Sequence, residues 1–203
     1  MQTFTLAAFL SRSTDKPFPE TTIYDVLSGL PSLSPSGPWI AGGALRRTLC
    51  GQEPDSDFDF FFGNAIQLDG FRRSMEAAGF ERVRETEHHF HYRGKSGKGA
   101  LQRDIQLIRF AFYQNAKEVI DSFDFTICQF AFDGTTLSIG DFALWDLGRK
   151  RLAINKITFP VSTARRLLKY AAQGFSACSG CLNAVVVATA NNPELRTDIE
   201  YVD

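Results

Sequence analysis

The sequence lacks any strong excess of charge of one sign. Its 203 residues include 22 Lys and Arg against 23 Asp and Glu, which gives a formal net charge of −1. This balance excludes a protein that coats nucleic acid through its overall charge. Any polyanion would have to be held by a local patch of cationic side chains.

Long apolar runs are also missing. No run reaches the roughly 20 residues that a membrane-spanning helix needs. The first residues, MQTFTLAAFLSRS, have neither the basic start nor the long apolar core of a secretory signal peptide. We therefore expect a cytoplasmic protein without a membrane partner.

Cysteine is scarce, with four residues at positions 50, 128, 178 and 181. Cys50 and Cys128 sit in apolar segments and are predicted to be small core residues. Cys178 and Cys181 form a single CxxC motif. A zinc site would need two further ligands, and the sequence offers no matching pair, so a zinc or redox role is the weaker interpretation.

The three histidines, His88, His89 and His91, all lie in one short segment. His89 and His91 would share one face of a strand, because side chains alternate between the two faces. A metal pair is one interpretation, but no third ligand is evident. Surface or partly buried strand histidines are the favoured interpretation.

Phenylalanine is abundant, at 19 residues, and 44% of the chain is hydrophobic, which is enough for one sizeable core. Residues 39–62 are predicted to form a strand, a glycine turn, a short helix, a loop and a second strand. On that second strand Asp57 and Asp59 would share one face, roughly 6–7 Å apart. The other face would be buried and would carry Phe58, Phe60 and Phe62.

The glycine turn is formed by Gly42 and Gly43. Glycine lets the backbone approach a ligand closely, and the start of the next helix offers N–H groups to an anion. A phosphate cradle followed by the carboxylates of Asp57 and Asp59 indicates nucleotide chemistry, since hard cations prefer oxygen ligands. The alternative is a helix-to-strand connection with a solvated acidic strand end.

These motifs, Gly42-Gly43-Ala44-Leu45-Arg46, then Gly51, then Asp57-Phe58-Asp59, resemble the signature of the polymerase-β-like nucleotidyltransferase superfamily. Within it the likeness is greatest to the head of tRNA CCA-adding enzymes and bacterial poly(A) polymerases. The resemblance implies an α+β fold, a palm with a mixed central sheet and flanking helices. It also implies a head domain with an N-terminal extension over residues 1–160, and a short helical neck-like element and tail over 161–203.

A second motif, Ser122 to Cys128, is similar to the RRDFTIN motif of the same family. Asp124 begins the matching DFTI. Ser122 and Phe123 replace the two arginines, and Cys128 replaces the asparagine. In the family this region helps to bind the incoming nucleotide.

A third likeness lies in the helix predicted over 163–175. Arg166 and Lys169 fall on the positions of two family arginines. They are three residues apart and share a helix face, which could meet phosphate or be a plain basic surface. The likeness covers residues 37–175, and Arg47 departs from it where the family usually has Asp.

The resemblance implies that Asp57, Asp59 and Asp104 are the catalytic and metal-binding residues. Asp104 would come from the neighbouring strand over 103–112, and the alternative there is an edge-strand aspartate that stays solvated. Two Mg²⁺ ions are expected, with Mn²⁺ as a substitute. Asp104 could also accept the proton of the acceptor hydroxyl.

The implied activity moves NMP from an NTP, such as ATP, to a hydroxyl group and releases pyrophosphate. An RNA 3′ end, including tRNA, is the first acceptor. NMP transfer to a protein or small molecule and a non-catalytic nucleotide-binding module are the alternatives. The expected nucleotide-binding residues are Gly42, Gly43, Arg46, Arg109, Asp124, Arg166 and Lys169.

Overall fold

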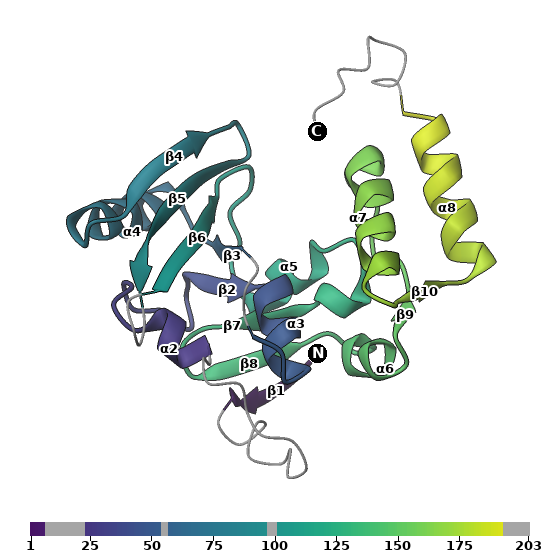
Figure 1. Cartoon of the computed structure of the whole chain (residues 1–203), viewed down its shortest axis with the longest axis horizontal. Helices are drawn as coiled ribbons and strands as arrows, with labels where there is room; N and C mark the ends of the chain where they lie inside the picture. Colours follow the sequence, from purple (N-terminus) through teal and green to yellow (C-terminus); the bar gives the residue numbers. More distant parts are fainter. Residues whose placement is uncertain (7–22, 54–56, 97–100, 193–203) are drawn as a thin grey trace. The chain divides into compact units, whose positions relative to one another are not determined.

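The computed structural model describes residues 1–6, 23–53, 57–96 and 101–192 (Figure 1). The chain forms two compact units. The first unit is Met1–Asp121 with Cys128–Asp141, and the second is Ser122–Ile127 with Phe142–Asp203. The expected domain division at residue 160 stays a prediction.

The first unit is built on an eight-stranded sheet with the order β1-β8-β7-β2-β3-β6-β5-β4. Its strands are β1 (Gln2–Thr5), β2 (Trp39–Ala41), β3 (Phe58–Phe61), β4 (Glu81–Glu85), β5 (His89–Ser96), β6 (Leu101–Ile108), β7 (Phe130–Phe132) and β8 (Thr136–Ile139). Strands β3 and β6 are parallel, and the other neighbours are antiparallel. The sheet is therefore mixed, which confirms the predicted α+β fold class.

The helices of this unit are α2 (Ile23–Leu27), α3 (Gly43–Leu49), α4 (Ala65–Ala77) and α5 (Ala116–Asp121). Helix α4 begins after Asn64, whose side chain accepts a hydrogen bond of 2.9 Å from the Gln67 N–H. The Phe71 ring of α4 lies 5.0 Å from that of Phe60 and 5.5 Å from that of Phe62. Helix α4 thus covers the phenylalanine side of β3.

The strands beside α4 alternate between buried and more exposed positions. Phe58 and Phe60 are buried on β3, and so are Tyr92 on β5 and Ile105 and Leu107 on β6. Burying such side chains stabilises the fold by about 1.5–3 kcal/mol each, before the entropy cost of ordering the chain. The intervening residues of these strands face the other side of the sheet, and these include both predicted β3 carboxylates.

The second unit holds three helices, α6 (Ala143–Gly148), α7 (Pro160–Ala172) and α8 (Ser179–Ala190), and a parallel pair of short strands, β9 (Arg151–Leu152) and β10 (Ser176–Ala177). A 3-10 turn, η1 (Thr126–Cys128), lies at the boundary of the two units. The Phe125 ring meets the Tyr170 ring of α7 edge-on at 5.6 Å, which fixes the segment 122–127 to α7. In the described part of the chain, no helix has both the length and the apolar character that crossing a bilayer requires.

All four cysteines lie in the described ranges, and none of them forms a disulfide bond. Cys128 is buried, as predicted for a small core residue. The same prediction was wrong for Cys50, which is exposed. Its apolar neighbours belong to α3, but Cys50 itself caps the C-terminus of that helix, where the chain turns outward.

Candidate active site

The turn between β2 and α3 requires glycine. Gly42 has φ 83° and ψ −131°, a conformation that residues with a Cβ rarely adopt. Its N–H donates to the carbonyl oxygen of Phe130 at 3.0 Å, which ties the turn to β7. Gly43 is the first residue of α3, and Arg46, one turn further, is 5% exposed. The predicted strand, glycine turn and short helix are all present.

Strand β3 places two carboxylates beside this turn. Asp59 pairs across the strands with Ala41, the residue before Gly42, and on its other side with Gln106 of β6. Asp57 directly precedes β3 and is exposed. The Gln106 side chain donates from Nε2 to Asp57 Oδ2 at 2.8 Å. Because residues two apart on a strand face the same way, Asp57, Asp59 and Gln106 share one side of the sheet.

Asp104 lies on the same side of β6 but contacts the opposite neighbour, β5. Its Oδ1 is 2.7 Å from His91 Nε2 and accepts a 2.9 Å hydrogen bond from Arg93 Nε. Partial burial would raise the pKa of Asp104, but the hydrogen bonds and charges of His91 and Arg93 outweigh it and hold this pKa below its usual value. Asp104 is therefore ionised at neutral pH.

We call this side of the three strands the polar face. It consists of Asp57 and Asp59 at β3, Asp104 and Gln106 on β6, and His91 and Arg93 on β5. The sequence did not single out Gln106, Arg93 or the pairing of His91 with Asp104. The register of β5 with β6, which sets Arg93 opposite Asp104 and His91 opposite Gln106, brings these side chains together.

The described ranges contain no cluster of three His, Cys, Asp or Glu side chains placed to hold a metal ion. Asp57 is bonded to Gln106, whereas Asp104 is turned to β5, so the three predicted carboxylates do not converge. Asp57 and Asp59 alone fit part of a site for a hard cation, since both offer carboxylate oxygens from one strand face. His91 and Arg93 both contact Oδ1 of Asp104, so Oδ2 is the oxygen that could join the two β3 carboxylates.

Arg109, predicted to bind nucleotide, lies elsewhere. Its Nη1 donates to Glu85 Oε1 at 2.7 Å, and its guanidinium lies 4.4 Å from the centroid of the Phe90 ring. Phe90 is buried on the side of the sheet that α4 covers, where Arg72 of α4 also lies over the ring. The head group of Arg109 is therefore on the α4 side and not on the polar face.

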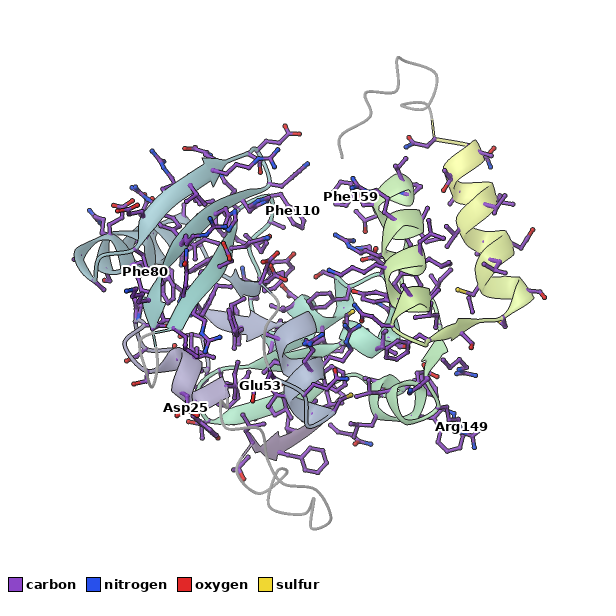
Figure 2. The ribbon with its side chains drawn as sticks, viewed as in Figure 1. Asp25, Glu53, Phe80, Phe110, Arg149 and Phe159 are labelled. Carbon is purple, nitrogen blue, oxygen red and sulfur yellow. The ribbon has the colours of Figure 1, made fainter. Side chains whose placement is uncertain are left out.

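His89 and His91 lie on β5, whereas His88 lies in the turn before it and is exposed. His89 is half-buried, with Nδ1 3.2 Å from Thr86 Oγ1, and burial lowers its pKa. The His88 ring meets the exposed Phe110 ring edge-on at 5.9 Å, and Phe110 follows β6 (Figure 2). His91 is bonded to Asp104, a predicted catalytic residue.

The last three predicted nucleotide-binding residues belong to the second unit. The Asp124 carboxylate accepts two hydrogen bonds from Arg166 Nη1, at 2.8 and 2.6 Å, and one of 2.8 Å from Thr163 Oγ1. The Asp124 side chain is only 13% exposed. Lys169 lies on the same face of α7, three residues after Arg166, and is exposed. The structure thus brings Asp124 and Arg166 together as an ion pair that sequence reasoning missed.

Comparison with protein families gives one match that covers more than half of the chain. The model of Gad2, described as "Gabija anti-defense 2 family protein", matches residues 4–150. The chain belongs to the Gad2 family. No curated protein matches this Gad2-family chain.

Solved structures share the fold. The Thermotoga maritima CCA-adding enzyme complexed with tRNA has a TM-score of 0.63 and 20% identity, over 97% of this chain and 48% of that one. A CCA-adding enzyme with CTP gives the same TM-score and identity over 97% and 49% of the two chains, and a tRNA-processing enzyme gives 0.53 and 25% over 75% and 42%. The chain spans about half the length of these proteins. The predicted resemblance to the nucleotidyltransferase head is confirmed at the level of the fold.

Proposed function

We propose that this Gad2-family protein is a metal-dependent nucleotidyltransferase, which moves NMP from an NTP to a hydroxyl group and releases pyrophosphate. The observation that carries this proposal is the position of Asp57 and Asp59 on one side of β3, with Asp59 paired to the residue before the Gly42 turn. Phosphoryl transfer depends mainly on positioning and charge neutralisation, so a small set of residues suffices.

Asp57 and Asp59 would hold Mg²⁺, with two ions expected and Mn²⁺ as a substitute. When bound, the ions would neutralise charge on the triphosphate and make the acceptor hydroxyl more acidic. We propose Asp104 as the third carboxylate, kept ionised by His91 and Arg93. Because its pKa is held low, Asp104 is better suited to binding a cation than to accepting a proton.

The triphosphate would meet the turn at Gly42 and Gly43, with Arg46 supplying positive charge from α3. The roles of Arg109, Asp124, Arg166 and Lys169 in nucleotide binding stay predictions. Arg166 would have to leave the Asp124 carboxylate in order to contact a phosphate. The salt dependence of NTP binding would reveal how many cationic side chains take part.

Two acceptor classes have support. An RNA hydroxyl is the first, because one solved structure of the same fold is a CCA-adding enzyme complexed with tRNA. A protein of the Gabija defence is the second, and the description of the Gad2 family as anti-defense favours it. Covalent addition of NMP to a defence component would inactivate it by blocking a hydroxyl group and adding negative charge.

The test is a labelling survey. Each α-labelled NTP is incubated with Mg²⁺ and the protein, in the presence of total RNA, tRNA, purified Gabija proteins or cell protein. We expect labelled acceptor with the wild-type protein and none with the double variant Asp57→Asn/Asp59→Asn. Loss of the label on ribonuclease treatment identifies RNA, and loss on protease treatment identifies protein. NTP binding without transfer in every arm would replace the proposal with a non-catalytic nucleotide-binding module.

A further inference from the structure

The CxxC motif lies at the start of α8, outside the residues proposed for nucleotidyl transfer. Cys178 is the N-cap residue of α8, and Cys181 is the third residue of the helix. The first turn is closed by the Leu182 N–H, which donates to the Cys178 carbonyl oxygen at 3.0 Å. A Cβ placed on Gly180 would lie 3.8 Å from Cys178 Sγ, so this sulfur lies beside the first turn of the helix.

The two thiols have opposite surroundings. Cys178 is exposed, whereas Cys181 is only 6% exposed. The backbone N–H groups at the start of α8, first that of Cys181 and then that of Gly180, lower the pKa of Cys178, and the charge of Arg151 adds to this effect. Burial raises the pKa of Cys181, and the neighbouring Cys178 raises it further.

We propose that Cys178 and Cys181 form a thiol–disulfide exchange site that reacts with low-molecular-weight disulfides, with Cys178 as the attacking thiol and Cys181 as the resolving thiol. Side chains three residues apart on one helical turn are neighbours, about 5–6 Å between Cβ atoms. A disulfide needs the two Cβ atoms to be about 3.5–4.5 Å apart, so the first turn has to close slightly when the bond forms. From the sequence alone, a redox role is the weaker interpretation of this motif.

The reaction balances in two steps. The Cys178 thiolate attacks one sulfur of the disulfide RSSR, so a Cys178–SR bond forms and RS⁻ leaves to take up a proton. Cys181 then loses its proton and attacks Cys178 Sγ, which forms the Cys178–Cys181 bond and releases the second RS⁻. Both cysteines are oxidised, and RSSR is reduced to two thiols.

Exposed Cys50 is the internal control, since it caps a helix C-terminus and not an N-terminus. In the full-length wild-type protein at neutral pH, iodoacetamide should alkylate Cys178 about three to ten times faster than Cys50, as followed by peptide mass spectrometry. Excess glutathione disulfide should then produce an intramolecular Cys178–Cys181 bond.

Two variants separate the roles of the thiols. Cys181→Ser should accumulate glutathione on Cys178, because the resolving thiol is missing. Cys178→Ser should leave Cys181 reduced, and serine is itself a good N-cap residue, so α8 should be preserved. Equal alkylation rates at Cys178 and Cys50, or glutathione on Cys181 in preference to Cys178, would overturn the proposal. The alkylation comparison uses the wild-type chain and does not depend on the folding of any variant.

Discussion

Two aspartates that each precede a phenylalanine in a family-like motif have opposite surroundings. Asp57, in the first unit, is exposed and accepts from the neutral amide of Gln106. Asp124, in the second unit, is nearly buried and accepts from the guanidinium of Arg166 and the hydroxyl of Thr163. Asp124 is thus already compensated by a cation of its own unit, whereas Asp57 stands at the start of a strand beside a glycine turn and can serve a ligand.

Asp146 extends the comparison. Its carboxylate is 0% exposed and accepts from Thr126 Oγ1 and Arg151 Nε, each at 2.6 Å. It joins the segment 122–127 to α6 and β9 within the second unit. The comparison therefore predicts that substitutions on the polar face lower the transfer activity, and that substitutions of the paired aspartates in the second unit lower the free energy of unfolding.

The largest effect is expected from Asp57→Asn or Asp59→Asn. Changing residues that only support metal ligands commonly costs 10–100-fold, so losing a direct ligand should lower transfer by at least about 100-fold. The free energy of unfolding should change by no more than about 0.5 kcal/mol, because both side chains lie outside the core. Single-turnover transfer and urea denaturation measure the two quantities. Wild-type turnover in both variants at saturating Mg²⁺ would remove these residues from the site.

Asp146→Ala should have the reverse profile. It would leave the Thr126 hydroxyl and the Arg151 guanidinium without their buried acceptor, at a cost of about 2–4 kcal/mol in the free energy of unfolding. Urea denaturation followed by circular dichroism measures this loss. The matched control is Asp69→Ala on α4, whose side chain is 58% exposed and 3.5 Å from Arg72, and which should cost at most about 0.5 kcal/mol. Equal losses in the two variants would contradict a structural role for Asp146.

The Asp124–Arg166 pair allows both roles to be separated. A double-mutant cycle with Asp124→Ala and Arg166→Ala should give a coupling energy of about 1–2 kcal/mol for unfolding. If Arg166 also contacts the triphosphate, Arg166→Ala should in addition weaken NTP binding by about 1.5–3 kcal/mol, and less so at high salt. Exposed Arg165→Ala is the control on the same helix. An unchanged NTP affinity with full coupling would assign Arg166 to structure alone.

The smallest effect is expected from Tyr92→Phe, in the first unit. Buried Tyr92 donates to Glu76 Oε1 at 2.6 Å, and burial together with this bond raises the pKa of Tyr92 from 10.0 to about 12. A raised pKa means that the neutral phenol stabilises the fold fully below pH 10.0, and that this contribution is lost as the pH rises towards about 12. The variant should lose about 1 kcal/mol at neutral pH and should lack this alkaline step. The free energy of unfolding of both proteins, measured across that pH range, tests this prediction. If the two free energies change in parallel with pH, the prediction is wrong.

The fold could be predicted because local patterns and tertiary packing agree. The alternation at Asp57 to Phe62 predicted the two faces of β3, and Gly42 and Gly43 predicted the turn between β2 and α3. Each of these follows from residues close together in the sequence.

The polar face could be predicted only in part, because its contacts depend on the register between paired strands. The pairing of β5 with β6 sets Arg93 opposite Asp104 and His91 opposite Gln106. This register decides which side chains bind the Asp104 carboxylate. The Asp124–Arg166 pair joins residues 42 positions apart. Sequence patterns identify the charged residues but not which charge each one meets.

The central claim is that the β3 carboxylates bind the metal ion that carries an NTP, and this can be measured without knowing the acceptor. The measurement is an electron paramagnetic resonance titration of free Mn²⁺ with the full-length protein and a non-hydrolysable NTP analogue. We predict that the wild-type protein depletes the free Mn²⁺ signal beyond the depletion that the NTP analogue causes alone, and that Asp57→Asn/Asp59→Asn abolishes this excess depletion while Asp69→Ala retains it. Equal NTP-dependent depletion by the wild-type protein and the double variant would contradict the claim.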